Sequence, residues 1–203
     1  MSDAAGMPAL AITLKQGSVL LRMRACLLCL LLLTACQPGH GLPDLPAALT
    51  GRYVLGPGDM VRLITYGEDQ LTGEFRVSDN GTVALPLIGS VKAAGLTPDA
   101  LGASVGQALL RANLLRSPSV SAEVVAYRPI FVLGEVSKPG QYPYQPGMTV
   151  VTAAAVAGGF TYRAIQDYAS VVRTQNGGAV EGRATRQAFI QPGDVITIYE
   201  RRF

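Results

Sequence analysis

Residues 53–61 read Y-V-L-G-P-G-D-M-V, and residues 191–196 repeat the centre of this stretch as Q-P-G-D-V-I. In both places Pro-Gly-Asp precedes a run of apolar and β-branched residues, which is typical of a strand. Pro fits the second and Gly the third position of a type II turn, and the Asp can accept hydrogen bonds from nearby backbone amides. We therefore expect structural turns, not catalytic sites, at two sets of residues: Gly56, Pro57, Gly58 and Asp59, and then Pro192, Gly193 and Asp194.

The chain between residues 60 and 127 predicts strands around one helix. Strands are expected at Met60–Tyr66 and Val120–Tyr127. Asn80-Gly81 lies between two short apolar-polar runs, residues 74–77 and 82–85, and predicts a hairpin between them, with residues 86–91 continuing the sheet. Thr97 can cap a helix that Pro98 begins and that runs to about Leu115.

The chain after residue 127 repeats this order. Residues 130–136 predict a strand that bends at Gly134, and residues 141–144 are expected to pair back with it. Thr149 can cap a short helix over residues 150–157. Asn176-Gly177-Gly178 predicts a second hairpin, and residues 195–199 the last strand. The fold class is therefore α+β, with two small domains and a boundary near residue 127.

The N-terminal residues predict a secretory signal. Arg22 and Arg24 precede an apolar run from Ala25 to Leu33, which is shorter than the ~20 residues that span a bilayer. A positive segment, a short apolar segment and small residues describe a signal peptide, which we place at residues 1–35. Leu33-Thr34-Ala35-Cys36 resembles the bacterial lipobox, in which the chain is cut before a Cys that is then acylated.

Cys36 is accordingly the expected lipidation site, and residues 36–52, rich in Pro and Gly, are expected to be a tether. Gln37 after the Cys permits sorting to the outer membrane. Two alternatives are a buried apolar helix with incidental cysteines and a Cys26-x-x-Cys29 redox or metal pair. The leucine neighbours disfavour the pair, because reactive thiolates need a polar or electropositive setting.

The remaining residues predict no catalytic site, no cofactor and no metal ligands. The only histidine, His40, lies in the tether, and the chain has no H-E-x-x-H, P-loop or G-x-S-x-G motif. Glu68 and Asp69 could form a carboxylate pair, although a solvated loop is favoured. Four tyrosines could stack on sugar rings or pack at contacts: Tyr142, Tyr144, Tyr162 and Tyr168.

Charge argues against a nucleic-acid partner. The formal net charge is +3, but residues 1–35 hold three of the 17 basic residues and one of the 14 acidic ones. The rest of the chain therefore carries a net charge of about +1, whereas nucleic-acid binding needs a clustered basic face.

The ordered motifs resemble the outer-membrane polysaccharide biosynthesis and export lipoproteins. The resemblance to their polysaccharide-export domain, expected over residues 53–127, rests on YVLGPGD at 53–59, VSDNGTV at 77–83 and LPLIG at 85–89. The resemblance to their soluble-ligand-binding β-grasp (SLBB) domain, expected over residues 128–203, rests on VLGEV with KPG at 132–140, AGGFT at 157–161 and PGDVI at 192–196.

The resemblance implies a lipid-anchored homo-oligomeric ring on the periplasmic face of the outer membrane that passes an exopolysaccharide or capsule chain. Its implied partners are the polymer and an inner-membrane polysaccharide copolymerase. The chain stops at Glu200-Arg201-Arg202-Phe203, directly after the last expected strand, and so resembles the short xanthan-type subgroup. This resemblance leaves room for a separate outer-membrane barrel as a further partner. Two alternatives stay open. One is a monomeric periplasmic lipoprotein that binds a soluble glycan or signal, and the other is a glycan-modifying enzyme that would use Glu68 or Asp69.

Overall fold

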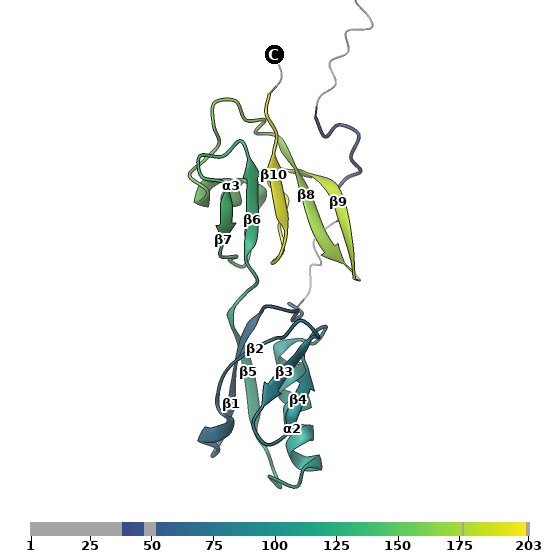
Figure 1. The fold of residues 1–203 in the computed structure, drawn as a ribbon, viewed down its shortest axis with the longest axis vertical. Helices are drawn as coiled ribbons and strands as arrows, with labels where there is room; N and C mark the ends of the chain where they lie inside the picture. The colour runs from purple at the N-terminus through teal and green to yellow at the C-terminus, as the bar shows by residue number, and fades with distance from the viewer. Residues whose placement is uncertain (1–37, 47–51, 176, 202–203) are drawn as a thin grey trace, which may run out of the picture. The chain divides into compact units, whose positions relative to one another are not determined.

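The computed structural model describes residues 38–46, 52–175 and 177–201, and Figure 1 shows their arrangement. The expected signal peptide and the expected lipidation site, Cys36, lie outside these residues. The described chain contains two α-helices and three sheets, two of them antiparallel and one mixed, so the expected α+β class is confirmed.

The first half contains a three-stranded sheet, a two-stranded sheet and one α-helix (Figure 1). Its elements are β1 (Met60–Thr65), the 3-10 helix η1 (Asp69–Leu71), β2 (Gly73–Arg76), β3 (Thr82–Leu85), β4 (Gly89–Lys92), α2 (Pro98–Arg111) and β5 (Val120–Ala126). The larger sheet has the antiparallel order β2-β1-β5, and β3 pairs only with β4.

Periodicity explains how this half buries its core. Strand β1 buries every second residue, which places Val61 and Leu63 on one face. Helix α2 buries Leu101, Val105 and Leu109 at spacings of four residues, which lie on one face of a helix. These side chains belong to one buried cluster.

The helix begins as the sequence predicts. The Thr97 side chain accepts a hydrogen bond from the amide of Ala100, and Pro98 occupies the first turn. The helix ends at Arg111, about one turn before the expected Leu115, and Asn113 then takes a positive φ of 52°. Asn tolerates this left-handed conformation better than most residues, so it reverses the chain there.

The expected hairpin between residues 74–77 and 82–85 is wrong. The turn itself forms, since the amide of Gly81 donates to Ser78 O at 2.8 Å. However, β2 pairs with β1, and β3 pairs with β4 in a separate sheet. The reason is that Val77 exchanges both of its backbone hydrogen bonds with Gly58 and Asp59, each at 2.8 Å, so the ladder cannot continue across the turn.

The second half is one five-stranded sheet with a short helix (Figure 1). Its elements are β6 (Ile130–Gly134), β7 (Gly140–Tyr142), α3 (Val150–Val156), β8 (Tyr168–Gln175), β9 (Gly178–Thr185) and β10 (Val195–Ile198). The order is β7-β6-β10-β8-β9, with β10 parallel to β6 and the other neighbours antiparallel. The predicted pairing of β7 with β6 and the hairpin between β8 and β9 are confirmed.

The predicted bend at Gly134 has a steric cause. Gly134 has a φ of +83°, which side-chain-bearing residues rarely adopt. A Cβ at this position would also overlap the carbonyl oxygen of Ile198 on the neighbouring strand β10. Gly134 thus lets the two parallel strands approach closely where β6 ends.

Within the described residues, no helix has both the length and the apolar character needed to cross a membrane.

Candidate functional site

The first Pro-Gly-Asp turn buries its aspartate completely. The amide of Asp59 donates to Gly56 O at 3.2 Å, and Gly58 has a φ of +95°, the geometry of a type II turn. The Asp59 carboxylate folds back and accepts the amide of Gly56 at 2.8 Å. It is 0% exposed, so it needs partners for both of its oxygens.

Two residues outside the turn complete the Asp59 site. The Tyr53 hydroxyl donates to Asp59 Oδ2 at 2.6 Å, and the amide of Arg128 donates to Oδ1 at 3.0 Å. The Arg128 guanidinium lies beside the carboxylate, with Nε 3.5 Å from Oδ1, and also donates to the Tyr53 hydroxyl. Burial, followed by the hydrogen bond to Asp59, raises the pKa of the Tyr53 phenol above its usual range. Asp59 therefore joins the turn before β1 to the connection between β5 and β6.

The second turn repeats this geometry with a different partner. The amide of Asp194 donates to Gln191 O at 3.1 Å, and Gly193 has a φ of +88°. The carboxylate accepts the amide of Gln191 at 2.7 Å. Here the cation is Arg173 on β8, whose guanidinium donates to both carboxylate oxygens.

Every nitrogen of the Arg173 guanidinium donates at least one hydrogen bond. Besides Asp194, it donates to the carbonyl oxygens of Phe189 at 3.2 Å and Pro46 at 3.1 Å. It is 1% exposed, as is Asp194. A buried pair of this kind contributes more to a unique arrangement than to net stability, because both ions lose their hydration.

Sequence reasoning missed both arginines. For Arg173 a signal exists: it follows Ala169 and Val171 at alternate positions of β8, and both are fully buried. A charge at an inward position of a strand needs a buried partner. No comparable signal marks Arg128, which lies between two elements.

The N-terminal segment, defined as residues 38–46, pairs with the free edge of the second sheet. Leu45 donates its amide to Arg183 O, and Arg183 donates its amide to Pro43 O, both at 2.8 Å, which makes a parallel bridge beside β9. The Tyr168 hydroxyl donates to Pro38 O at 2.9 Å. Thus the described part of the expected tether supplies hydrogen-bond partners to backbone groups of an edge strand that would otherwise have none in the sheet.

Gly182 makes this pairing sterically possible. A Cβ on Gly182 would lie 2.6 Å from Leu45 Cα, closer than real side chains allow. Leu45 also packs against the buried cluster of the second half. The Arg183 guanidinium lies 4.1 Å from the centre of the Tyr168 ring, within the range of a cation–π contact.

The other candidates from the sequence are not brought into a reactive arrangement. Neither Glu68 nor Asp69 has a side-chain hydrogen bond or ion pair with another described residue. Tyr168 is 6% exposed, and Tyr142 and Tyr144 pack against the second core, whereas Tyr162 is 87% exposed. The described part of the chain contains no group of three or more His, Cys, Asp or Glu residues placed to hold a metal ion.

The two halves of the chain match two different domain families. Residues 47–125 match the polysaccharide biosynthesis/export protein family, and residues 129–184 match the SLBB domain, in the expected order. The chain belongs to the polysaccharide export family.

Curated relatives agree with this assignment. The exopolysaccharide production protein ExoF of Rhizobium meliloti is 37% identical over 90 residues, 44% of this chain and 21% of that protein. The EPS I polysaccharide export outer membrane protein EpsA of Ralstonia nicotianae is 28% identical over 157 residues, 71% of this chain and 40% of that protein. The polysialic acid transport protein KpsD of Escherichia coli is 30% identical over 92 residues, 44% of this chain and 16% of that protein. The chain spans less than half the length of each.

Proposed function

We propose that this chain is a lipid-anchored component of a system that exports exopolysaccharide or capsule polymer, and that it acts as a homo-oligomeric ring on the periplasmic face of the outer membrane. The observation that supports it most is the ordered pair of domains, polysaccharide export followed by SLBB. The relatives are named for exopolysaccharide production, for polysaccharide export at the outer membrane and for polysialic acid transport. Two of these names describe export or transport, and we propose no catalytic activity for this chain.

The proposed anchor is Cys36 in the motif Leu33-Thr34-Ala35-Cys36. Pro38, two residues later, begins the N-terminal segment that pairs with β9. Two residues span at most about 7 Å of extended chain. An acylated Cys36 would therefore hold the five-stranded sheet close to the lipid surface, since little free chain separates the two.

The proposed partners are the polymer, an inner-membrane polysaccharide copolymerase and further copies of this chain. Closed rings form when one surface of a subunit binds a different surface of the next and the rotation closes. The names of two relatives, for polysaccharide export and polysialic acid transport, support a polymer partner. The similarity to the short xanthan-type subgroup belongs to the same proposal.

Gene deletion tests the export role. The deletion strain should lose surface polysaccharide while lipid-linked repeat units are still made, and the wild-type gene should restore the polymer. Normal secreted polymer in the deletion strain would refute the proposal.

Metabolic labelling with palmitate tests the anchor. Cys36→Ser should abolish labelling and release the protein from membranes, whereas Cys29→Ser is a matched control that should leave both unchanged. Mass measurement of the purified lipidated protein tests the ring. A stable monomer would support the alternative, a periplasmic lipoprotein that binds a soluble glycan through its second domain.

A further inference from the structure

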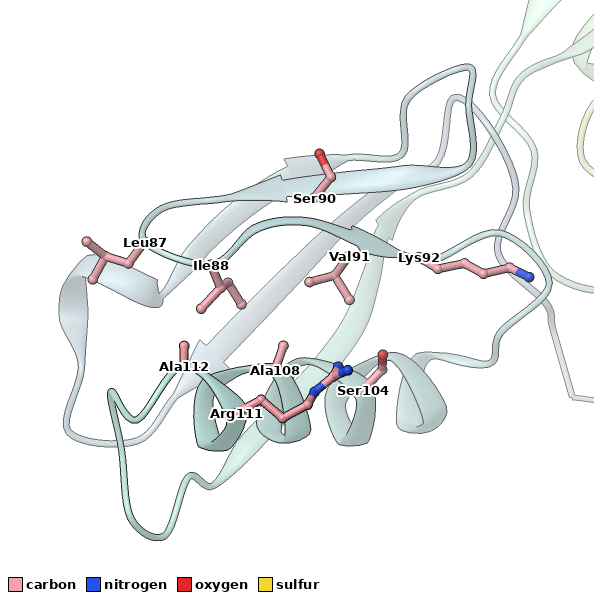
Figure 2. Close-up of a pocket in the computed structure, with 9 residues that line it drawn as sticks. All are labelled: Leu87, Ile88, Ser90, Val91, Lys92, Ser104, Ala108, Arg111 and Ala112. Atoms are coloured by element: carbon pink, nitrogen blue, oxygen red, sulfur yellow. The ribbon is translucent and has the colours of Figure 1, made fainter.

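A pocket of about 500 Å³ lies between helix α2 and the hairpin of β3 and β4 (Figure 2), and no residue of either Pro-Gly-Asp turn lines it. This volume is within the range of small-molecule sites, roughly 300–1,000 Å³. Its lining residues are Leu87, Ile88, Ser90, Val91, Lys92, Ser104, Ala108, Arg111 and Ala112.

The floor of the pocket is apolar. Figure 2 shows Ile88 and Val91 pointing from the hairpin toward α2, and Ala108 pointing from α2 toward the hairpin. At the tip of the hairpin, Leu87 is 70% exposed and has a φ of 67°, which a branched side chain adopts only at a cost. The short connection between β3 and β4 thus places the apolar side chain of Leu87 in solvent at the edge of the pocket.

The two charged residues that line the pocket are both cationic. Lys92 comes from the hairpin and Arg111 from the helix, and no acidic residue lines the pocket. Neither cation forms an ion pair with any described residue. Arg111 donates only its Nε to Gln107 O, at 3.4 Å, so its terminal amino groups stay available for a ligand. By contrast, the exposed Arg62 in the same half contacts both Glu74 and Glu123.

We infer that this pocket binds an acidic sugar, one whose ring carries a carboxylate. One carboxylate would lie at the Arg111 guanidinium, which matches the planar geometry of a carboxylate. Lys92 points away from Arg111 in Figure 2, so it would contact a carboxylate on another residue of the same polymer chain. The C–H face of the ring would pack on Ile88 and Ala108, and the hydroxyl of Ser104 on α2 can bond to sugar hydroxyls. This inference rests on the proposed export role and adds a substrate class to it: a polymer that contains uronic or similar acidic residues.

Binding of labelled oligosaccharides to the purified full-length chain in detergent tests the inference. Fluorescence anisotropy should show binding of an oligogalacturonate, and an unlabelled neutral maltohexaose should not compete. The variant Lys92→Gln/Arg111→Gln should lower the affinity about tenfold, since two partly exposed charged contacts are lost. A rise in salt from 0.05 to 1 M should weaken binding as well, because the Debye length falls from more than about 10 Å to about 3 Å.

Two further variants separate the pocket from general charge. Arg116→Gln/Arg186→Gln removes the same charge from exposed positions outside the pocket and should keep wild-type affinity. Ala112→Trp leaves both cations in place but fills the rim from an exposed position, so it should also lower the affinity. Equal losses in the charge-matched control, or equal binding of maltohexaose, would overturn the inference.

The outcomes also distinguish this inference from the export role. If deletion of the gene stops polymer secretion but the acidic oligosaccharide does not bind, only the pocket assignment fails. If Lys92→Gln/Arg111→Gln changes the oligomeric mass and no sugar binds, the occupant is a carboxylate of a second copy, and the assignment to sugar is overturned. If the deletion strain secretes normal polymer, the export role fails first.

Discussion

Arg173 and Asp194 form a two-pronged ion pair inside the second half of the chain, with Nη2–Oδ2 at 2.7 Å and Nε–Oδ1 at 3.1 Å. Both residues are 1% exposed. The same guanidinium reaches Pro46 O, so one buried cation connects the last strand, its turn and the N-terminal segment.

Replacement of Asp194 by Asn should destabilise the protein by about 3–5 kcal/mol, because it leaves a buried guanidinium without its counter-charge. Urea unfolding followed by circular dichroism measures the change. Glu74→Gln is the control, since the Arg62–Glu74 pair is 45% exposed on each side and should contribute less than about 1 kcal/mol. Similar small losses in both variants would contradict the role assigned to the buried pair.

Tyr53 should make stability fall at alkaline pH. Its pKa is raised in the folded protein above the ordinary value of 10.0, chiefly by burial. The Tyr53 phenol ionises at a lower pH in the unfolded chain than in the folded protein. Its contribution to the free energy of unfolding is therefore fully present below pH 10 and is lost as the pH rises from 10 toward the folded pKa.

In Tyr53→Phe the free energy of unfolding should therefore fall less steeply above pH 10. The slope should differ from that of the wild type by less than about 1 kcal/mol per pH unit, because the Tyr53 ring is partly exposed. Chemical unfolding at pH 8 to 11 gives the slope. Tyr66→Phe, at a site 86% exposed, should keep the wild-type slope. An unchanged slope in Tyr53→Phe would count against the burial of the Tyr53 hydroxyl beside Asp59.

Gly134→Ala and Gly147→Ala should differ although both glycines have a φ of +83°. At Gly147 a Cβ meets nothing within 4 Å, so the cost is the backbone strain alone, about 1–2 kcal/mol. At Gly134 the new methyl overlaps the carbonyl oxygen of Ile198, so the loss should exceed the control by about 2 kcal/mol or more. Thermal unfolding of the two variants compares them. Equal melting temperatures would show that β6 and β10 approach less closely than described.

Gly182→Ala should release the N-terminal segment from β9. The added methyl would lie 2.6 Å from Leu45 Cα, and the segment can move away more easily than the sheet. Hydrogen exchange at the amides of Leu45 and Arg183 should accelerate about tenfold or more, because both hydrogen bonds are lost. Gly178→Ala on the same strand has its nearest contact at 3.8 Å and should leave both amides protected. Unchanged protection in Gly182→Ala would refute the pairing.

Local pattern was enough to predict many features of the fold. Thr97 caps α2 and Thr149 caps α3, because a cap depends on a side chain and an amide three residues away. The hairpin of β8 and β9 likewise depends on neighbouring residues. The motif order indicated the family for the same reason, since each motif encodes a local turn or strand.

Contacts between distant segments decided the rest. The turn at Asn80-Gly81 suggested a hairpin, but Val77 accepts a hydrogen bond from the amide of Gly58 and donates one to Asp59 O, about 20 positions earlier in the chain. The partners of the two aspartates could not be predicted either: Asp59 is joined by Arg128 and Asp194 by Arg173. A buried carboxylate must find a donor, but its own sequence neighbourhood does not say which one, because only packing brings the two groups together.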